Sequence, residues 1–109
     1  MSVIKYNKLV RDRIPEIIEE SGKSCKAVIL DDAEYLRMLD AKLDEELAEY
    51  HKDQNIEELA DLLEVIYAAA IARGCTVEEL EQVRRQKVEE RGAFKRKIFL
   101  LEVEKPDTN

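Results

Sequence analysis

The sequence predicts an all-α protein, an antiparallel helical bundle, and three observations carry that prediction. Its 109 residues include only 3 Gly and 2 Pro, which suits long helices joined by few turns. Apolar residues recur at three- and four-residue spacing through the middle of the chain. A content of 45% hydrophobic and 39% charged residues is typical of a folded, soluble protein.

Length and composition also restrict the class of protein. We expect a single domain over residues 1–104 and a frayed tail over 105–109. The longest apolar run, 65–72, is too short to span a bilayer, and the N-terminus lacks the apolar core of a signal peptide. Two cysteines without a CxxC motif indicate reduced thiols, so we expect a cytoplasmic protein. The net charge of −7 argues against nucleic acid or an anionic membrane surface as a partner.

Four helices are expected, because residues that favour helix ends flank four segments of helical pattern. Pro15 suits the first turn of a short helix. Side-chain acceptors precede three longer helices, at Asp31, Asn55 and Thr76. Glycines follow the first, third and fourth segments. The expected helices are 15–21, 32–52, 56–73 and 77–91.

Two features bear on how these helices are covered. The short apolar segments 26–30 and 98–103 have strand character, so we expect the bundle with or without a small two-stranded ribbon. The helix over 56–73 is apolar on nearly every side, which is typical of a central, buried helix. Because so short a chain has few other helices to cover it, we expect a homodimer or homotetramer.

Two pairs of carboxylates lie in consecutive expected helices. Glu46 and Glu49 form the first pair, and Glu58 and Asp61 form the second. Each pair has i, i+3 spacing, which places both members on one face of a helix. Facing acidic pairs are unfavourable unless a cation lies between them.

The acidic pairs have two interpretations. In the first they are an ordinary solvated surface, where Lys42 and Lys52 neutralise the first pair and Glu58 completes a capping box with Asn55. In the second they bind a metal ion. Asp61 favours the second, because Asp is a poor residue for a helix interior and leucines surround it.

The ligand type indicates which metal. Carboxylate oxygens suit magnesium, manganese or calcium rather than zinc or copper, and no calcium-loop pattern is present. The only histidine, His51, lacks the Glu-x-x-His spacing of a di-iron bundle. Mg²⁺ often shares its coordination shell with substrate phosphates, and Mn²⁺ can replace it. Two basic clusters, 5–13 and 84–97, are suited to hold such phosphates.

Three motifs resemble those of the MazG-like all-α NTP pyrophosphatases, a superfamily that also contains phosphoribosyl-ATP pyrophosphohydrolase and dimeric dUTPases. The acidic signature is EExxE at 45–49 followed by ExxD at 58–61. The segment YNKLVRDRIP at 6–15 is similar to the opening of a small phosphoribosyl-ATP pyrophosphohydrolase-like subgroup. The segment KxxxRGxF at 87–94 resembles the one that follows the last core helix of these proteins.

The resemblance implies a helical bundle of that family's type and a magnesium-dependent reaction, in which NTP and water give NMP and pyrophosphate. It implies metal ligands at Glu46, Glu49, Glu58 and Asp61, and a supporting or catalytic role for Glu45. It implies substrate contacts at Lys87, Arg91, Asn7, Lys8, Arg11 and Asp12. For Arg11 and Asp12 the competing interpretation is a simple ion pair that anchors the N-terminus.

One departure from the family pattern limits the inference about substrate. The connection between the acidic motifs, residues 50–57, is shorter than in many members, so base preference does not carry over. The expected role is removal of unwanted nucleoside triphosphates. The alternatives are a phosphoribosyl-ATP pyrophosphohydrolase and a helical oligomerisation or regulatory module without turnover.

Overall fold

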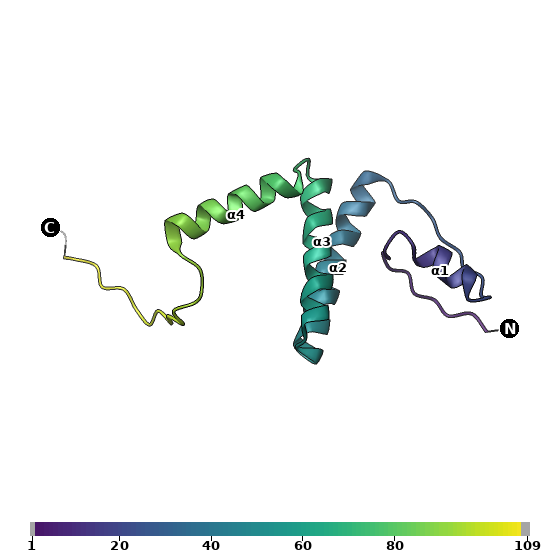
Figure 1. Ribbon diagram of the computed structural model, residues 1–109, viewed down its shortest axis with the longest axis horizontal. Coiled ribbons are helices and arrows are strands. Elements are labelled where there is room, and N and C mark those ends of the chain that lie inside the picture. The colour runs from purple at the N-terminus through teal and green to yellow at the C-terminus, as the bar shows by residue number, and fades with distance from the viewer. Residues whose placement is uncertain (1, 108–109) are drawn as a thin grey trace. The chain divides into compact units, whose positions relative to one another are not determined.

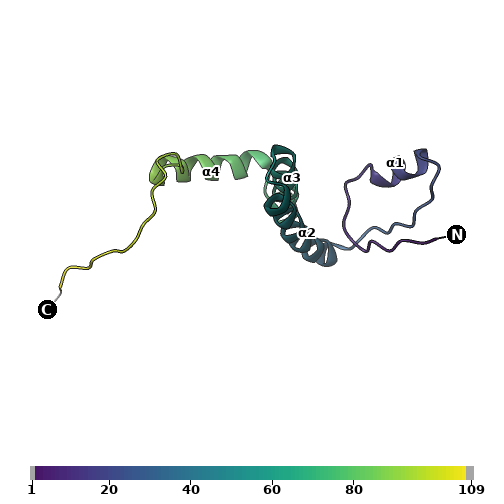
Figure 2. The same ribbon diagram turned by 90° about the horizontal axis from the view of Figure 1, so that it is seen from below.

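The computed structural model describes residues 2–107. Across that range the regular elements are four α-helices, and none is a strand (Figures 1 and 2). The all-α prediction is therefore confirmed, and the helix ends agree with the expected ones within two residues. The helices are α1 (Ile14–Glu20), α2 (Asp32–Asp53), α3 (Ile56–Ala72) and α4 (Val77–Arg91).

Local capping explains where the two long helices of the site begin. The Asp31 side chain accepts a hydrogen bond from the Glu34 backbone N–H at 2.9 Å, which starts α2. The Asn55 side chain accepts one from the Glu58 backbone N–H at 3.0 Å, which starts α3. At the other end of α3, Gly74 has a φ of +89°, a conformation that glycine adopts without strain.

The optional ribbon is not present. Residues 26–30 and 98–103 form no strand in the structure. Their side chains are largely in solvent, as Ile29 and Phe99 show. An isolated extended segment gains no ladder hydrogen bonds, so apolar, β-branched composition alone does not make a strand.

The chain divides into two compact units, residues 1–77 and 78–109. The first unit contains α1, α2 and α3, and the second contains α4 from its second residue onward. The single domain over 1–104 stays a prediction. The expected tail has no helix or strand over 105–107, and its last two residues lie outside the described range.

The core of the first unit lies between α2 and α3, which run side by side as an antiparallel pair (Figures 1 and 2). Leu39 of α2 is 2% exposed and Val65 of α3 is 9% exposed. Only Gln54 and Asn55 join the two helices. Gln54 has a φ of +51°, and its backbone N–H donates to the Tyr50 carbonyl at 2.7 Å. This tight turn places the end of α2 beside the start of α3.

The expected burial of α3 is not achieved within one chain. Val65 is its one buried residue, while Leu59, Leu63 and Ile66 remain exposed. These side chains leave an apolar surface that the described part of a single copy does not cover. The homodimer or homotetramer stays a prediction. None of the described helices is long and apolar enough to cross a membrane.

Candidate metal centre

Three of the four predicted metal ligands meet where α2 and α3 face each other. Glu46, Glu58 and Asp61 each offer a carboxylate oxygen, and the three oxygens lie within 4.8 Å of one another. All three residues are partly buried. Because the turn between the helices is so short, the last turns of α2 lie beside the first turns of α3. The antiparallel pairing thus brings two separate sequence motifs to one place.

The fourth predicted ligand, Glu49, belongs to a second group. Its carboxylate lies with those of Asp53 and Glu58, again within 4.8 Å of one another. Glu58 is therefore shared by both groups. Asp53 was not among the predicted ligands, although its i, i+4 spacing from Glu49 in the last turn of α2 indicates a shared helix face.

Glu58 carries the electrostatic mark of this crowding. Desolvation raises the pKa of its carboxyl, and the charges of four neighbouring carboxylates raise it further. Those neighbours are Asp61, Asp53, Glu49 and Glu46. The ionised form of Glu58 is thus disfavoured in the folded chain, and a bound cation would relieve that penalty.

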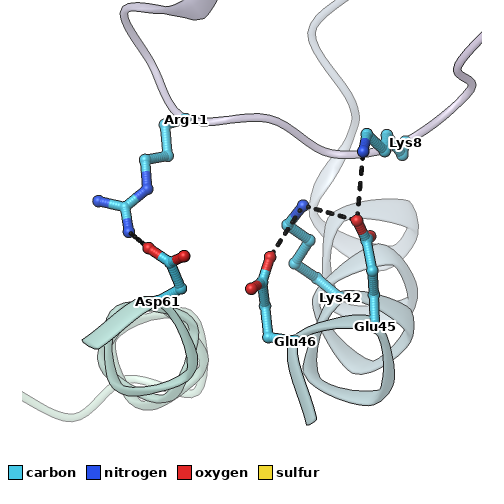
Figure 3. A network of polar contacts seen from close by, with 6 residues as sticks. All are labelled: Lys8, Arg11, Lys42, Glu45, Glu46 and Asp61. Carbon is cyan, nitrogen blue, oxygen red and sulfur yellow. Dashed lines mark hydrogen bonds and ion pairs between the residues drawn. The ribbon is translucent and has the colours of Figure 1, made fainter. Parts of the chain in front are cut away.

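Glu45 lies outside both groups and is held by two lysines (Figure 3). Its Oε1 accepts from Lys8 Nζ at 3.2 Å and from Lys42 Nζ at 3.3 Å. Burial raises the pKa of Glu45, but the bonds from both lysines outweigh it, so that pKa lies below its ordinary value. Glu45 is therefore a carboxylate that positions ammonium groups.

Lys42 was expected only under the solvated-surface interpretation, and its pairing is present. Lys42 Nζ also lies 3.3 Å from Glu46 Oε1, and the two side chains are only 16% and 12% exposed. The pair is therefore partly buried, unlike an ordinary surface ion pair. The i, i+3 and i, i+4 spacing of Lys42 to Glu45 and Glu46 is the signal that identifies it.

Arg11 reaches the same cluster from the N-terminal segment. Its Nη2 donates to Asp61 Oδ1 at 2.7 Å (Figure 3). The competing interpretation paired Arg11 with Asp12; the structure instead gives it Asp61, a predicted metal ligand. Arg11, a predicted phosphate contact, is thus hydrogen-bonded to Asp61, a predicted metal ligand.

The other predicted substrate contacts are all exposed residues. Asn7 is exposed and has a φ of +47°, and Asp12 is exposed beside the first turn of α1. Lys87 and Arg91 are exposed residues of α4 in the second unit. Their role at a substrate stays a prediction.

Comparison with known proteins adds one partial match. No family model and no solved structure matches the chain. A protein of Mycolicibacterium smegmatis (strain ATCC 700084 / mc(2)155), described as an uncharacterized protein, is 60% identical over 42 residues. The match covers 38% of this chain and 43% of that protein, so the chain accounts for less than half of its relative's length. That description states no activity.

Proposed function

We propose that the chain is a magnesium-dependent nucleoside triphosphate pyrophosphohydrolase, which converts NTP and water into NMP and pyrophosphate. The observation that supports it best is the group of Glu46, Glu58 and Asp61, whose carboxylate oxygens gather within 4.8 Å across two helices. Desolvation and the charges of neighbouring carboxylates raise the pKa of Glu58, so its ionised form would be favoured by a further counter-charge. A divalent cation would provide it.

The donor set fits magnesium. All the candidate ligands are carboxylate oxygens, which Mg²⁺ and Mn²⁺ prefer. Glu46, Glu58 and Asp61 would hold one ion, and Glu49 with Asp53 offers further ligands beside the shared Glu58. Bound magnesium supplies Lewis acidity toward phosphoryl oxygens.

The remaining side chains of the cluster have distinct tasks in this proposal. Lys42 holds Glu46 in place from the same helix. Glu45 supports the site by fixing Lys8 and Lys42. Lys8 contacts Glu45 and Arg11 contacts Asp61, and both cations are suited to hold the phosphates of a nucleotide.

A second candidate function is a helical oligomerisation module without turnover. The exposed Leu59, Leu63 and Ile66 on α3 favour it, because a contiguous apolar surface is typical of a protein interface. The two functions make different predictions about catalysis, since a pure oligomerisation module releases no product from any nucleotide.

The deciding experiment measures pyrophosphate and NMP release from a panel of nucleotides with Mg²⁺ or Mn²⁺. The panel contains canonical and modified NTPs and dNTPs together with phosphoribosyl-ATP. Pyrophosphate with NMP is the expected result. Activity on phosphoribosyl-ATP alone would favour the alternative of a phosphoribosyl-ATP pyrophosphohydrolase, and no release from any nucleotide would contradict the enzyme proposal.

A pair of matched variants ties the activity to the site. Asp61→Asn keeps the shape of the side chain but removes the charge, and it should lower the rate by about 100-fold or more. Asp44→Asn is the control, because Asp44 is an exposed residue of α2 outside both carboxylate groups. Circular dichroism should show both variants helical. Equal activity of Asp61→Asn and wild type would contradict the assignment of the site.

A further inference from the structure

The N-terminal segment crosses the acidic helix pair and contacts both helices (Figure 3). Lys8 donates to Glu45 on α2 at 3.2 Å, and Arg11 donates to Asp61 on α3 at 2.7 Å. We call residues 8–11 the N-terminal strap. Lys8 therefore contacts Glu45, the residue next to the predicted ligand Glu46, and Arg11 contacts the predicted ligand Asp61 directly.

The two kinds of cation at this cluster differ in how firmly they are held. Lys42 is mostly buried, lies on the same helix as its partners and contacts two carboxylates. The Arg11 side chain is 58% exposed, and the side chain of its partner Asp61 is 42% exposed. Arg11 also belongs to a different segment from its partner, because it precedes α1 whereas Asp61 lies in α3. An ion pair in such contact with water is weak and is screened by salt. Arg11 is thus a removable counter-ion, whereas Lys42 is a permanent one.

We propose that Arg11 neutralises Asp61 in the metal-free chain and that a divalent cation displaces it on binding. The inference rests on the proposed function, since it takes Glu46, Glu58 and Asp61 as the cation site. Mg²⁺ binds oxygen ligands at about 2.1 Å. An ion that close to Asp61 would repel the positively charged Arg11 guanidinium at the same carboxylate. Glu46, Glu58 and Asp61 would together hold the divalent cation, whereas the guanidinium contacts one of these carboxylates, Asp61. The guanidinium is therefore the group that leaves.

Displacement gives the freed side chain a new partner. A guanidinium binds phosphate oxygens with two parallel hydrogen bonds, and the N-terminal strap keeps it next to the incoming cation. The anion suited to receive it is a polyphosphate that arrives with the metal. Arg11 is thus a carboxylate partner in the free chain and a phosphate partner in the loaded one.

The test is the affinity of the full chain for Mn²⁺, measured by electron paramagnetic resonance in the absence of nucleotide. Arg11→Gln removes the competing charge and should bind Mn²⁺ about fivefold more tightly than wild type, the factor that one surface ion pair represents. Arg13→Gln is the matched control. It makes the same change in net charge in the same region, and Arg13 contacts Glu16 rather than the acidic cluster.

Each outcome decides the question. Tighter binding by Arg11→Gln alone supports displacement. Equal tightening in both variants attributes the effect to net charge and overturns the proposal. Weaker binding by Arg11→Gln means that Arg11 positions Asp61 for the metal, which also overturns it. Wild-type protein that binds no Mn²⁺ refutes the cation site itself, and unchanged affinity in Arg11→Gln refutes only the displacement.

A second readout needs no variant. Limited trypsin digestion of wild-type protein reports access to the bond after Arg11, because trypsin must bind that side chain. Added Mg²⁺ should speed this cleavage and leave cleavage after Lys23 unchanged, since Lys23 is an exposed residue outside the N-terminal strap and both carboxylate groups. Slower or unchanged cleavage after Arg11 in saturating Mg²⁺ would contradict displacement.

Discussion

Arg11 and Asp61 are 50 positions apart in the sequence, and one hydrogen bond of 2.7 Å joins their side chains. The contact connects the basic N-terminal segment to the acidic start of α3. Two motifs that the sequence shows only as separate clusters of opposite charge therefore form one polar site. The basic N-terminal segment and the acidic start of α3 should therefore be interpreted together, as parts of one site.

Replacing Glu58 with Gln should stabilise the metal-free chain near neutral pH. Desolvation and the neighbouring carboxylates raise the pKa of Glu58, so its ionised form is unfavourable in the folded state. The melting temperature in a chelating buffer should therefore rise. Glu57→Gln is the control, because Glu57 is an exposed residue of α3 outside both groups, and it should change little. Mg²⁺ should raise the melting temperature of wild type and not of Glu58→Gln.

The stabilisation by Glu58→Gln should depend on pH. Since the pKa of Glu58 is raised above 4.5 in the folded chain, folding favours its protonated form. That contribution to stability is fully present below pH 4.5 and is lost as the pH rises through the raised folded value. In acid the wild-type side chain is neutral, as Gln is. The difference in melting temperature should therefore vanish in acid, and a difference that stayed constant with pH would rule out this electrostatic cause.

Lys42→Met should destabilise the hairpin of α2 and α3. It leaves Glu46, which is only 12% exposed, without its ammonium partner. We expect a loss of about 1–2 kcal/mol in the free energy of unfolding, measured in urea, and partial recovery in Lys42→Arg. Lys52→Met, an exposed change in the last turn of α2, should cost less than about 1 kcal/mol. If both variants lost the same free energy of unfolding, the burial of the Lys42 ion pair would not add to stability.

Helix ends and acidic motifs could be predicted because their causes are local. The caps at Asp31 and Asn55 use backbone groups three residues away, and i, i+3 spacing is a property of a single helix. The partner of Arg11 could not be predicted, because no spacing rule connects residues so far apart. Pairing it with the adjacent Asp12 was the local choice, and a contact across the fold replaced it.

Leu39→Ala should test where the core lies. Leu39 is 2% exposed, and its truncation should lower the free energy of unfolding by about 2–5 kcal/mol. Leu101→Ala makes the same chemical change at a residue that is 86% exposed, and it should cost little. Urea unfolding followed by circular dichroism compares the two. A large loss at Leu101 would mean that another surface covers it in solution.

The apolar surface of α3 should bring copies of the chain together. Leu59, Leu63 and Ile66 have i, i+4, i+7 spacing and share one side of the helix. Sedimentation at micromolar concentration should give a mass above the 12.7 kDa of one chain, and Leu63→Gln should shift it toward that value. Val28→Gln, at an exposed residue outside the helices, is the control. A monomeric wild type would disprove the expected homo-oligomer.

The burial of α3 could not be derived from its composition for a related physical reason. A helix that is apolar on nearly every side is predicted to be buried, but the pattern does not say which surface covers it. In the described part of one chain, α2 covers only the side that contains Val65. The composition of α3 predicts that the helix is buried, but it does not identify the surface that buries it.

The two-residue link of Gln54 and Asn55 has a consequence for how this chain can change. Each residue added to a helix turns everything after it by about 100°. One extra residue that extended α2 or α3 at the link would rotate Glu58 and Asp61 away from Glu46, although every side chain of the cluster would still be present. The length of the connection therefore matters to the site as much as the carboxylates themselves. We expect the chain to tolerate an insertion here only if the added residues form a loop, so that the same faces of α2 and α3 still meet.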